Sequence, residues 1–195
     1  MGMPNNKLSD VAFKYTWRGL NQTDPTVTQD FEEAGIALNN TSQGLQVQLW
    51  TFSTNGTDII VDAPSLPAPI TLLSPTNVAS VRGCFDQNMN PFVAYLQEGQ
   101  WNYWWFDTVV GHMVTSQLPS GVTSVVCTLD DKRPWESNIS DICLLYTNNG
   151  NLYYRRQRDR YGIEYLLKTS VNGTLVKVAM NGIERLQIKL QATVI

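Results

Sequence analysis

The sequence has little charge. Charged residues make up 16 % of its 195 residues, and the formal net charge is −3, whereas about a quarter of a typical soluble domain is charged. Strong attraction to phosphate groups needs a concentration of positive charge. The composition therefore argues against nucleic acid and against an anionic membrane surface as partners.

Cysteine and histidine are also scarce. The chain has three cysteines, Cys84, Cys127 and Cys143, with no CxxC pair, and one histidine. An odd number excludes a complete disulfide framework, and so few Cys and His residues argue against a zinc site. We expect three free, buried thiols in a protein folded in a reducing cytosol, with neither a metal nor a cofactor.

Long apolar runs are missing from the sequence. The first ten residues, MGMPNNKLSD, lack the basic and apolar regions of a signal peptide, and no run of about 18 apolar residues follows. We therefore expect synthesis and folding in the cytosol and no membrane partner.

Residues for catalysis are few. The lone His112 has no nucleophile motif beside it, and a strand or loop role is the simpler interpretation. Asp130 and Asp131 are consecutive, so a strand would point them to opposite faces rather than pair them as glycosidase acids do. Asp86 and Asp130 are interpreted as residues that accept hydrogen bonds from turn amides. We expect no enzyme activity.

What the chain does have is a repeated hairpin. An apolar run at 142–146 meets the turn residues Asn149 and Gly150, and a second apolar run, 152–154, follows. The same spacing precedes and follows Gly99, and a related pattern surrounds Gly56. Three hairpins of one design are predicted.

Alternation with a period of two covers much of the remaining chain. It is clearest at 186–194 and also present at 45–49, and such a period predicts strands with one face on a core. Residues 29–38 could form one helical turn. Residues 1–30 are interpreted as an N-terminal arm, with alternating Val11, Phe13, Tyr15 and Trp17, and residues 31–195 as one β domain.

These features predict an all-β fold. Repeats of 43 to 51 residues are typical of propeller blades or of a β-trefoil. We expect an open propeller-like or sandwich-like domain that covers its strand edges by assembly, with the trefoil as the alternative.

An aromatic run stands in the second hairpin. Trp101, Tyr103, Trp104, Trp105 and Phe106 lie within six positions. Such residues dominate both cores and oligomer interfaces, which is the favoured interpretation. Stacking on the sugar rings of a glycan is the alternative.

An arginine run follows the third hairpin. Arg155, Arg156, Arg158 and Arg160 fall within six positions. Contact with an acidic partner, pairing with acids of the same chain such as Glu164, and phosphate binding are the competing interpretations. Partner contact is favoured, and a continuing strand would put Arg156, Arg158 and Arg160 on one face.

Four segments resemble a family of tailed-bacteriophage virion proteins: IALNNTSQGLQVQLWTF (36–52), CFDQN with PFVAY (84–95), LDDKRP (129–134) and SDICLLY with GNLYYRRQRDRYGIEY (140–165). The resemblance covers roughly residues 30–168 and is most specific in the last segment. It does not extend to the N-terminal arm or to residues 169–195.

The resemblance implies a structural role in the phage tail, as an adaptor, nozzle or fibre-attachment component built from propeller-like units. It implies a symmetric homo-oligomer, other tail proteins as partners, a place in the virion after assembly in the host cytoplasm, and no catalytic residues. The alternative function is a carbohydrate-binding module of a receptor-recognition apparatus. An enzyme acting on surface glycans is a third candidate.

Overall fold

A computed structural model describes residues 32–41, 44–64, 66–86, 90–129, 142–180 and 186–191, with the backbone alone at 32–49, 129, 176–180, 186, 187 and 189. The predicted arm and the segment around Asp130 and Asp131 lie outside the described residues. The regular secondary structure of the described chain is almost entirely β-strand, which confirms the all-β prediction.

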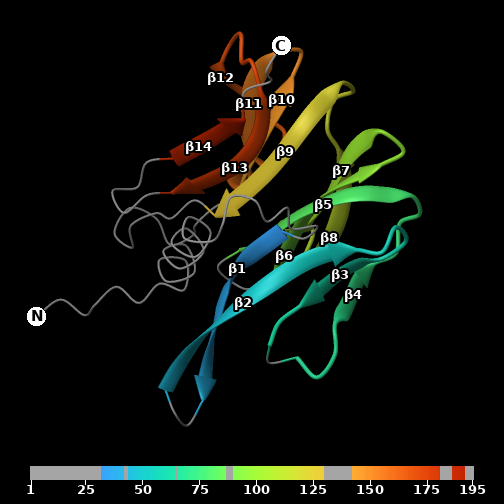
Figure 1. The fold of residues 1–195 in the computed structure, drawn as a ribbon, viewed down its shortest axis with the longest axis vertical. Helices are drawn as coiled ribbons and strands as arrows, with labels where there is room; N and C mark the ends of the chain where they lie inside the picture. The colour runs from blue at the N-terminus through green and yellow to red at the C-terminus, as the bar shows by residue number, and fades with distance from the viewer. Residues whose placement is uncertain are drawn as a thin grey trace, which may run out of the picture.

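Three antiparallel sheets of four strands follow one another along the chain, each with its strands in sequence order (Figure 1). Sheet 1 contains β1 (Glu32–Thr41), β2 (Gly44–Thr54), β3 (Ile59–Asp62) and β4 (Ile70–Leu73). Sheet 2 contains β5 (Val78–Phe85), β6 (Pro91–Gln97), β7 (Gln100–Asp107) and β8 (His112–Gln117). Sheet 3 contains β9 (Val122–Leu129), β10 (Ile142–Asn148), β11 (Asn151–Arg156) and β12 (Tyr165–Lys168).

The last sheet is smaller. Sheet 4 has two antiparallel strands, β13 (Thr174–Met180) and β14 (Leu186–Gln191). The only helix in the described part of the chain is a single 3-10 turn, η1 (Gln157–Asp159), after β11. The expectation of a helical turn at 29–38 is wrong for its described part, because residues 32–41 form β1, which pairs along its length with β2.

The three predicted hairpins are confirmed as β2–β3, β6–β7 and β10–β11. In the second and third, two residues connect the strands, and all four have positive φ: Glu98 (50°), Gly99 (79°), Asn149 (48°) and Gly150 (71°). This is the type I′ turn, whose twist matches that of the strands it joins. The Gly and Asn residues at these turns were therefore a reliable signal.

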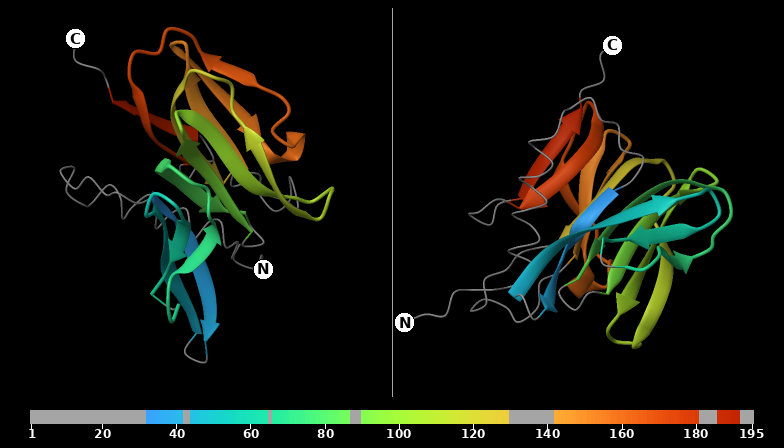
Figure 2. Two further views of the ribbon diagram at one scale, coloured as in Figure 1. Left: turned by 90° about the vertical axis from the view of Figure 1, so that its right-hand side faces the viewer. Right: turned by 60° about the horizontal axis from the view of Figure 1, so that its bottom comes forward.

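The sheets stack face to face in chain order, and a separate core fills each gap between them (Figure 2). The alternation of β6 explains how one strand serves two cores. Phe92 and Ala94 face sheet 3, whereas Val93 and Tyr95 face sheet 1. In β10, Leu144 likewise belongs to the core shared with sheet 2, and its neighbours face sheet 4.

The first strands of neighbouring sheets are in contact: β1 with β5, β5 with β9 and β9 with β13. Four-stranded sheets are also the unit of a propeller blade. The finer predictions, a propeller-like or sandwich-like arrangement and the trefoil alternative, stay predictions. In the described residues no helix is long and apolar enough to cross a membrane.

Candidate functional site

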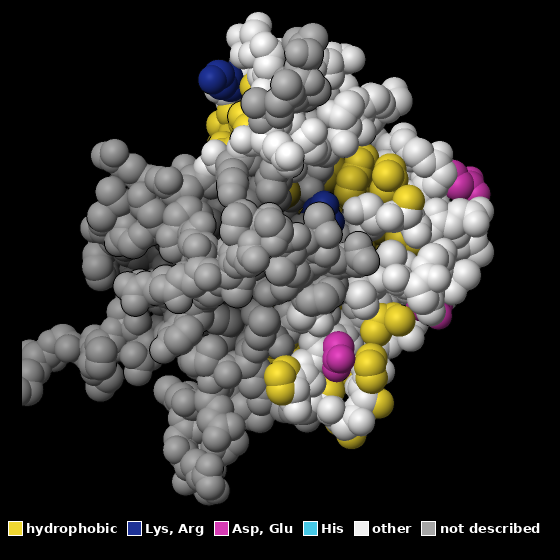
Figure 3. Space-filling model, in the orientation of Figure 1, with side chains coloured by type: hydrophobic (Ala, Val, Ile, Leu, Met, Phe, Trp, Pro, Cys, Tyr) yellow, Lys and Arg dark blue, Asp and Glu magenta, His cyan; other side chains and the backbone are white. Residues whose placement is uncertain are grey.

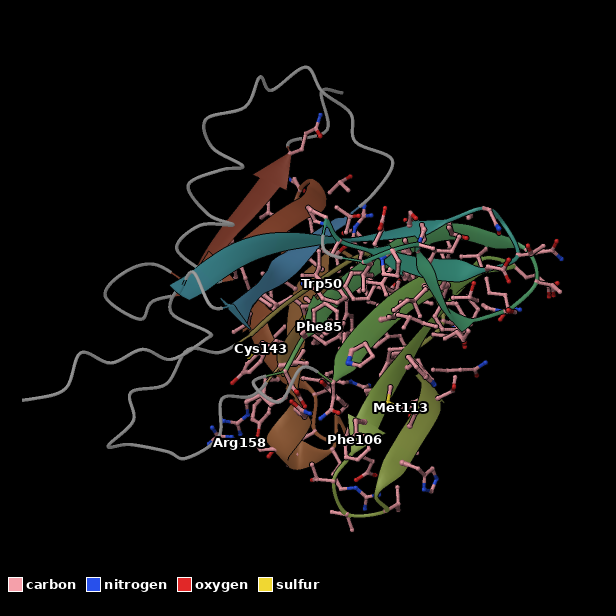
Figure 4. The ribbon with its side chains drawn as sticks, turned by 90° about the horizontal axis from the view of Figure 1, so that it is seen from below. Trp50, Phe85, Phe106, Met113, Cys143 and Arg158 are labelled. Carbon is pink, nitrogen blue, oxygen red and sulfur yellow. The ribbon has the colours of Figure 1, made fainter. Side chains whose placement is uncertain are left out.

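The aromatic run occupies β7 and serves two cores. Trp101, Tyr103 and Trp105 are 3 to 5 % exposed and pack between sheets 2 and 3. Trp104 points to the other face and is half-buried against the core shared with sheet 1. Phe106 is half-buried and pairs with Met113 of β8 (Figure 4). The run is thus mainly a core element, and burial of Trp105 leaves its ring no free face for a sugar.

The arginine run does not continue the strand. β11 ends at Arg156, and the 3-10 turn over Gln157–Asp159 bends the chain away. Arg160 and Tyr161 then adopt left-handed backbone conformations, with φ of 50° and 57°. The face that Arg156, Arg158 and Arg160 would share in an extended strand does not form, and each arginine reaches a different environment.

Arg155 is held inside the chain. Its Nε donates to the Tyr146 hydroxyl oxygen at 2.9 Å, and its Nη2 lies 3.2 Å from Glu164 Oε2. The Tyr146 hydroxyl donates to the same carboxylate. Burial and then this carboxylate raise the pKa of Tyr146, so the phenol stays protonated. Pairing with Glu164, one of the predicted alternatives, is confirmed.

Arg156 joins a second network on the opposite face of sheet 3. Its Nε donates to Asp159 Oδ2 at 2.9 Å, and its Nη2 donates to the Tyr165 hydroxyl oxygen at 2.6 Å. Its guanidinium also lies 4.7 Å from the centre of the Tyr165 ring. The Tyr165 hydroxyl in turn donates to Asp159 at 2.9 Å. The Arg156 side chain as a whole is 27 % exposed.

Arg160 connects two sheets. Its Nη2 lies 2.5 Å and its Nε 3.0 Å from Asp107 Oδ2, at the end of β7 in sheet 2. Burial of Asp107 opposes its ionisation. The hydrogen bonds and charge of Arg160, with backbone amides of the following turn, outweigh that effect and lower the pKa of this carboxyl. The pair therefore fastens the end of sheet 3 to sheet 2.

Tyr161 completes this connection, in a role that sequence patterns do not predict. The side chain is 1 % exposed and packs against Phe92, Tyr103 and Trp105, with ring centres 4.9 to 5.4 Å away. The backbone reversal that places it there depends on positive φ at two residues that are not glycine or asparagine. Arginine and tyrosine rarely adopt positive φ, so the residue types at these positions do not predict such a turn.

The remaining candidates have structural environments. His112 is exposed at the start of β8, with Nδ1 3.2 Å from the Val110 carbonyl oxygen. Asp86 accepts from the backbone and side-chain amides of Asn90, both at 2.9 Å, which confirms its predicted turn role. None of the three cysteines forms a disulfide; Cys84 and Cys143 are buried as expected, whereas Cys127 is only half-buried. Burial raises the pKa of the Cys84 thiol well above its ordinary value.

Apolar side chains reach the surface at a few places. The space-filling view shows separate hydrophobic patches and few charges on the described part of that face (Figure 3). Leu166 and Leu167 of β12 are 55 and 42 % exposed. Within the described chain, β12 and β14 each have one neighbour in their sheets, so their outer edges are open. Open edges and exposed leucines make this end of the molecule the candidate assembly surface.

Neither the comparisons with known proteins nor the arrangement of metal-binding side chains points to a competing site. No model of a known protein family matches the chain, and no curated protein matches it at a significant level. In the ranges that the structure describes, no three His, Cys, Asp or Glu side chains are arranged to hold a metal ion.

Proposed function

We propose that the chain is a structural protein of a bacteriophage tail, an adaptor, nozzle or fibre-attachment component that acts by symmetric assembly and docking. The tail assignment derives from the sequence segments that resemble such proteins. The assembly mechanism derives from the unequal sheets. Three sheets have four strands, whereas the described part of sheet 4 has two and an open edge on β14.

An unfinished sheet favours association for a physical reason. Two-stranded sheets are marginal in water, and an open edge presents unpaired backbone amides and carbonyls that another strand can bind. The packing also supports a scaffold, because most aromatic side chains in the described part of the chain belong to the cores between the sheets. An acidic partner would meet Arg158, which is exposed within η1 (Figure 4), and the exposed part of the Arg156 side chain.

The location of the chain tests this function. Gold-labelled antibodies against the purified chain should mark the tail of intact particles of the phage that encodes it. Labelling of the capsid alone, or of infected-cell lysate but not of particles, would overturn the proposal.

The glycan-binding alternative depends on a half-buried residue. Of the two tryptophans that would stack best, Trp105 is 4 % exposed, and Trp104 packs in part against the core of sheets 1 and 2. A glycan array separates the two functions. A scaffold gives no hits, whereas hits that disappear in Trp104→Ala, with folding retained, would favour the carbohydrate-binding module.

A further inference from the structure

In its described part, sheet 4 packs on sheet 3 with two strands. Among its described side chains, Leu175 of β13 and Ile188 and Leu190 of β14 belong to the core that the two sheets share. In the equivalent gap between sheets 1 and 2, sheet 1 contributes residues from three strands, β2, β3 and β4. The described part of sheet 4 has no third or fourth strand beyond β14.

The outer strands of sheet 3, on the face toward sheet 4, have the chemistry of an interface. Tyr154 and Tyr165 are paired across β11 and β12 with their rings stacked 4.8 Å apart, and both are half-buried. Tyr154 packs at the border of the core that sheet 4 shares, which places the pair on that face. Arg156 lies over Tyr165. Tyrosine and arginine are among the residues enriched at the centres of protein interfaces.

At the other end of the molecule, part of the β1–β2 hairpin extends beyond the other strands of sheet 1. β3 pairs only with residues 51–54 of β2, so 44–50 pair with β1 alone. This part of the β1–β2 hairpin projects beyond the rest of sheet 1 (Figure 1). The views of Figures 1 and 2 place it well apart from sheet 4 of the same chain. It can therefore reach the β14 edge only of another copy.

The projecting hairpin matches the missing half of sheet 4. In β2, Leu45, Val47 and Leu49 alternate with glutamines. Because successive strand residues face opposite ways, these three lie on the face opposite to Phe52, which packs on sheet 2. The pairing with β1 adds Leu38 opposite Val47 and Ile36 opposite Leu49. The register thus puts five apolar residues of this ribbon on the face opposite to that of Phe52.

Charge and spacing agree with this match. The sequence has no charged residue from Ala34 to Thr57, as interface centres require. Leu186, Ile188 and Leu190 alternate in β14 as Leu45, Val47 and Leu49 do in β2. Antiparallel pairing with Val47 opposite Ile188 puts all six on one face and sets Gln46 opposite Lys189.

We propose that residues 44–50 of one copy pair with β14 of the next, so that its β1–β2 hairpin supplies the third and fourth strands of sheet 4 and covers Tyr154 and Tyr165. The contact uses different surfaces on the two copies, so it repeats head to tail and generates a ring or a filament. This inference rests on the proposed function, since it names the contact by which the assembly forms.

Disulfide trapping between mixed copies tests the contact. A Gln46→Cys copy mixed with a Lys189→Cys copy under mild oxidation should give a cross-linked dimer, and peptide mapping should identify the 46–189 bond. Neither variant alone should give that product. Gln46→Cys mixed with Thr71→Cys, on the open edge of β4, is the matched control and should stay unlinked.

The other outcomes each overturn the contact. Equal cross-linking to Thr71→Cys would show non-specific edge pairing. Cross-linking of Lys189→Cys to Tyr15→Cys instead would assign the β14 edge to the N-terminal segment. An assembly that forms without the 46–189 bond would remove this contact but leave the proposed function, whereas a monomer at all concentrations would remove both.

A pair of charge variants gives a second measurement on the full chain. Val47→Glu puts a charge on the apolar face and should weaken association at least ten-fold. Gln46→Glu faces the other way, opposite Lys189, and should leave association unchanged or stronger. Equal effects of the two variants, with both folded, would contradict the register.

Discussion

Tyr161 combines a fully buried aromatic ring with a buried hydroxyl. Its ring fills the space between sheets 2 and 3, but within the described chain its hydroxyl has no hydrogen-bond partner. A buried hydroxyl without a hydrogen-bond partner destabilises the folded state, whereas burial of the ring stabilises it. The hydroxyl and the ring of Tyr161 therefore have opposite effects on the free energy of unfolding.

Two substitutions separate these effects. Tyr161→Phe removes only the hydroxyl and should leave the free energy of unfolding unchanged or raise it by about 1 kcal/mol. Tyr161→Ala removes the ring and should lower it by about 3 to 5 kcal/mol. Urea denaturation measures both. A large loss in Tyr161→Phe would mean that the hydroxyl has a partner.

At Gly83 the fold leaves no room for a side chain. A Cβ atom at this position of β5 would lie 2.5 Å from Cγ of Phe52, which is completely buried. The Phe52 ring therefore packs directly on the backbone of sheet 2, and only glycine allows this approach.

Gly83→Ala should accordingly lower the free energy of unfolding by about 1 to 3 kcal/mol through overpacking. In the Phe52→Leu background the same change should cost less, because a smaller side chain leaves room for the added methyl. The double-mutant cycle is measured by denaturation. Additive losses would indicate that Gly83 and Phe52 do not constrain each other.

Among the secondary-structure elements, an ion pair joins sheet 2 to sheet 3 near the ends of β7 and β11. Asp107 follows the last aromatic of β7, and Arg160 follows η1, 53 positions later. Because the folded carboxyl has a lowered pKa, its contribution to stability is complete above the ordinary aspartate pKa of about 3.9 and is lost as the pH falls through the folded value.

The acid limb of the stability curve tests this pair. Asp107→Asn and Arg160→Gln should each lower the midpoint of thermal unfolding by several degrees at pH 7. Both variants should lose less stability than the natural chain as the pH falls below about 4. Parallel acid limbs for all three proteins would show that Asp107 does not contribute to the pH dependence.

The elements were predictable to the extent that local patterns determine them. Alternation located the strands around Val47 and Ile188, and Gly99 and Gly150 located two turns. The role of Arg155 to Arg160 was harder to predict. Positive φ at Arg160 and Tyr161 breaks the expected strand, and the partner of Arg160 comes from another sheet. Neither the backbone reversal nor the distant partner has a signal in neighbouring residues.

At the scale of the molecule, the repeats indicated an all-β chain, but the sequence did not reveal how its sheets divide their strands. Two features depend on where strand pairing stops: the part of the β1–β2 hairpin that projects beyond sheet 1, and the small size of sheet 4. Pairing of β2 with β3 stops at Thr51, and the described part of sheet 4 ends at β14. These limits come from three-dimensional register. The same limits explain why we place the assembly contact at the two ends of the stacked sheets.

If open strand edges are completed by other copies, the full chain must form a defined oligomer in solution. Native mass spectrometry of the purified protein at micromolar concentration should give a defined multiple of the 21.9 kDa chain mass. A single species at 21.9 kDa that persists as the concentration rises would contradict it.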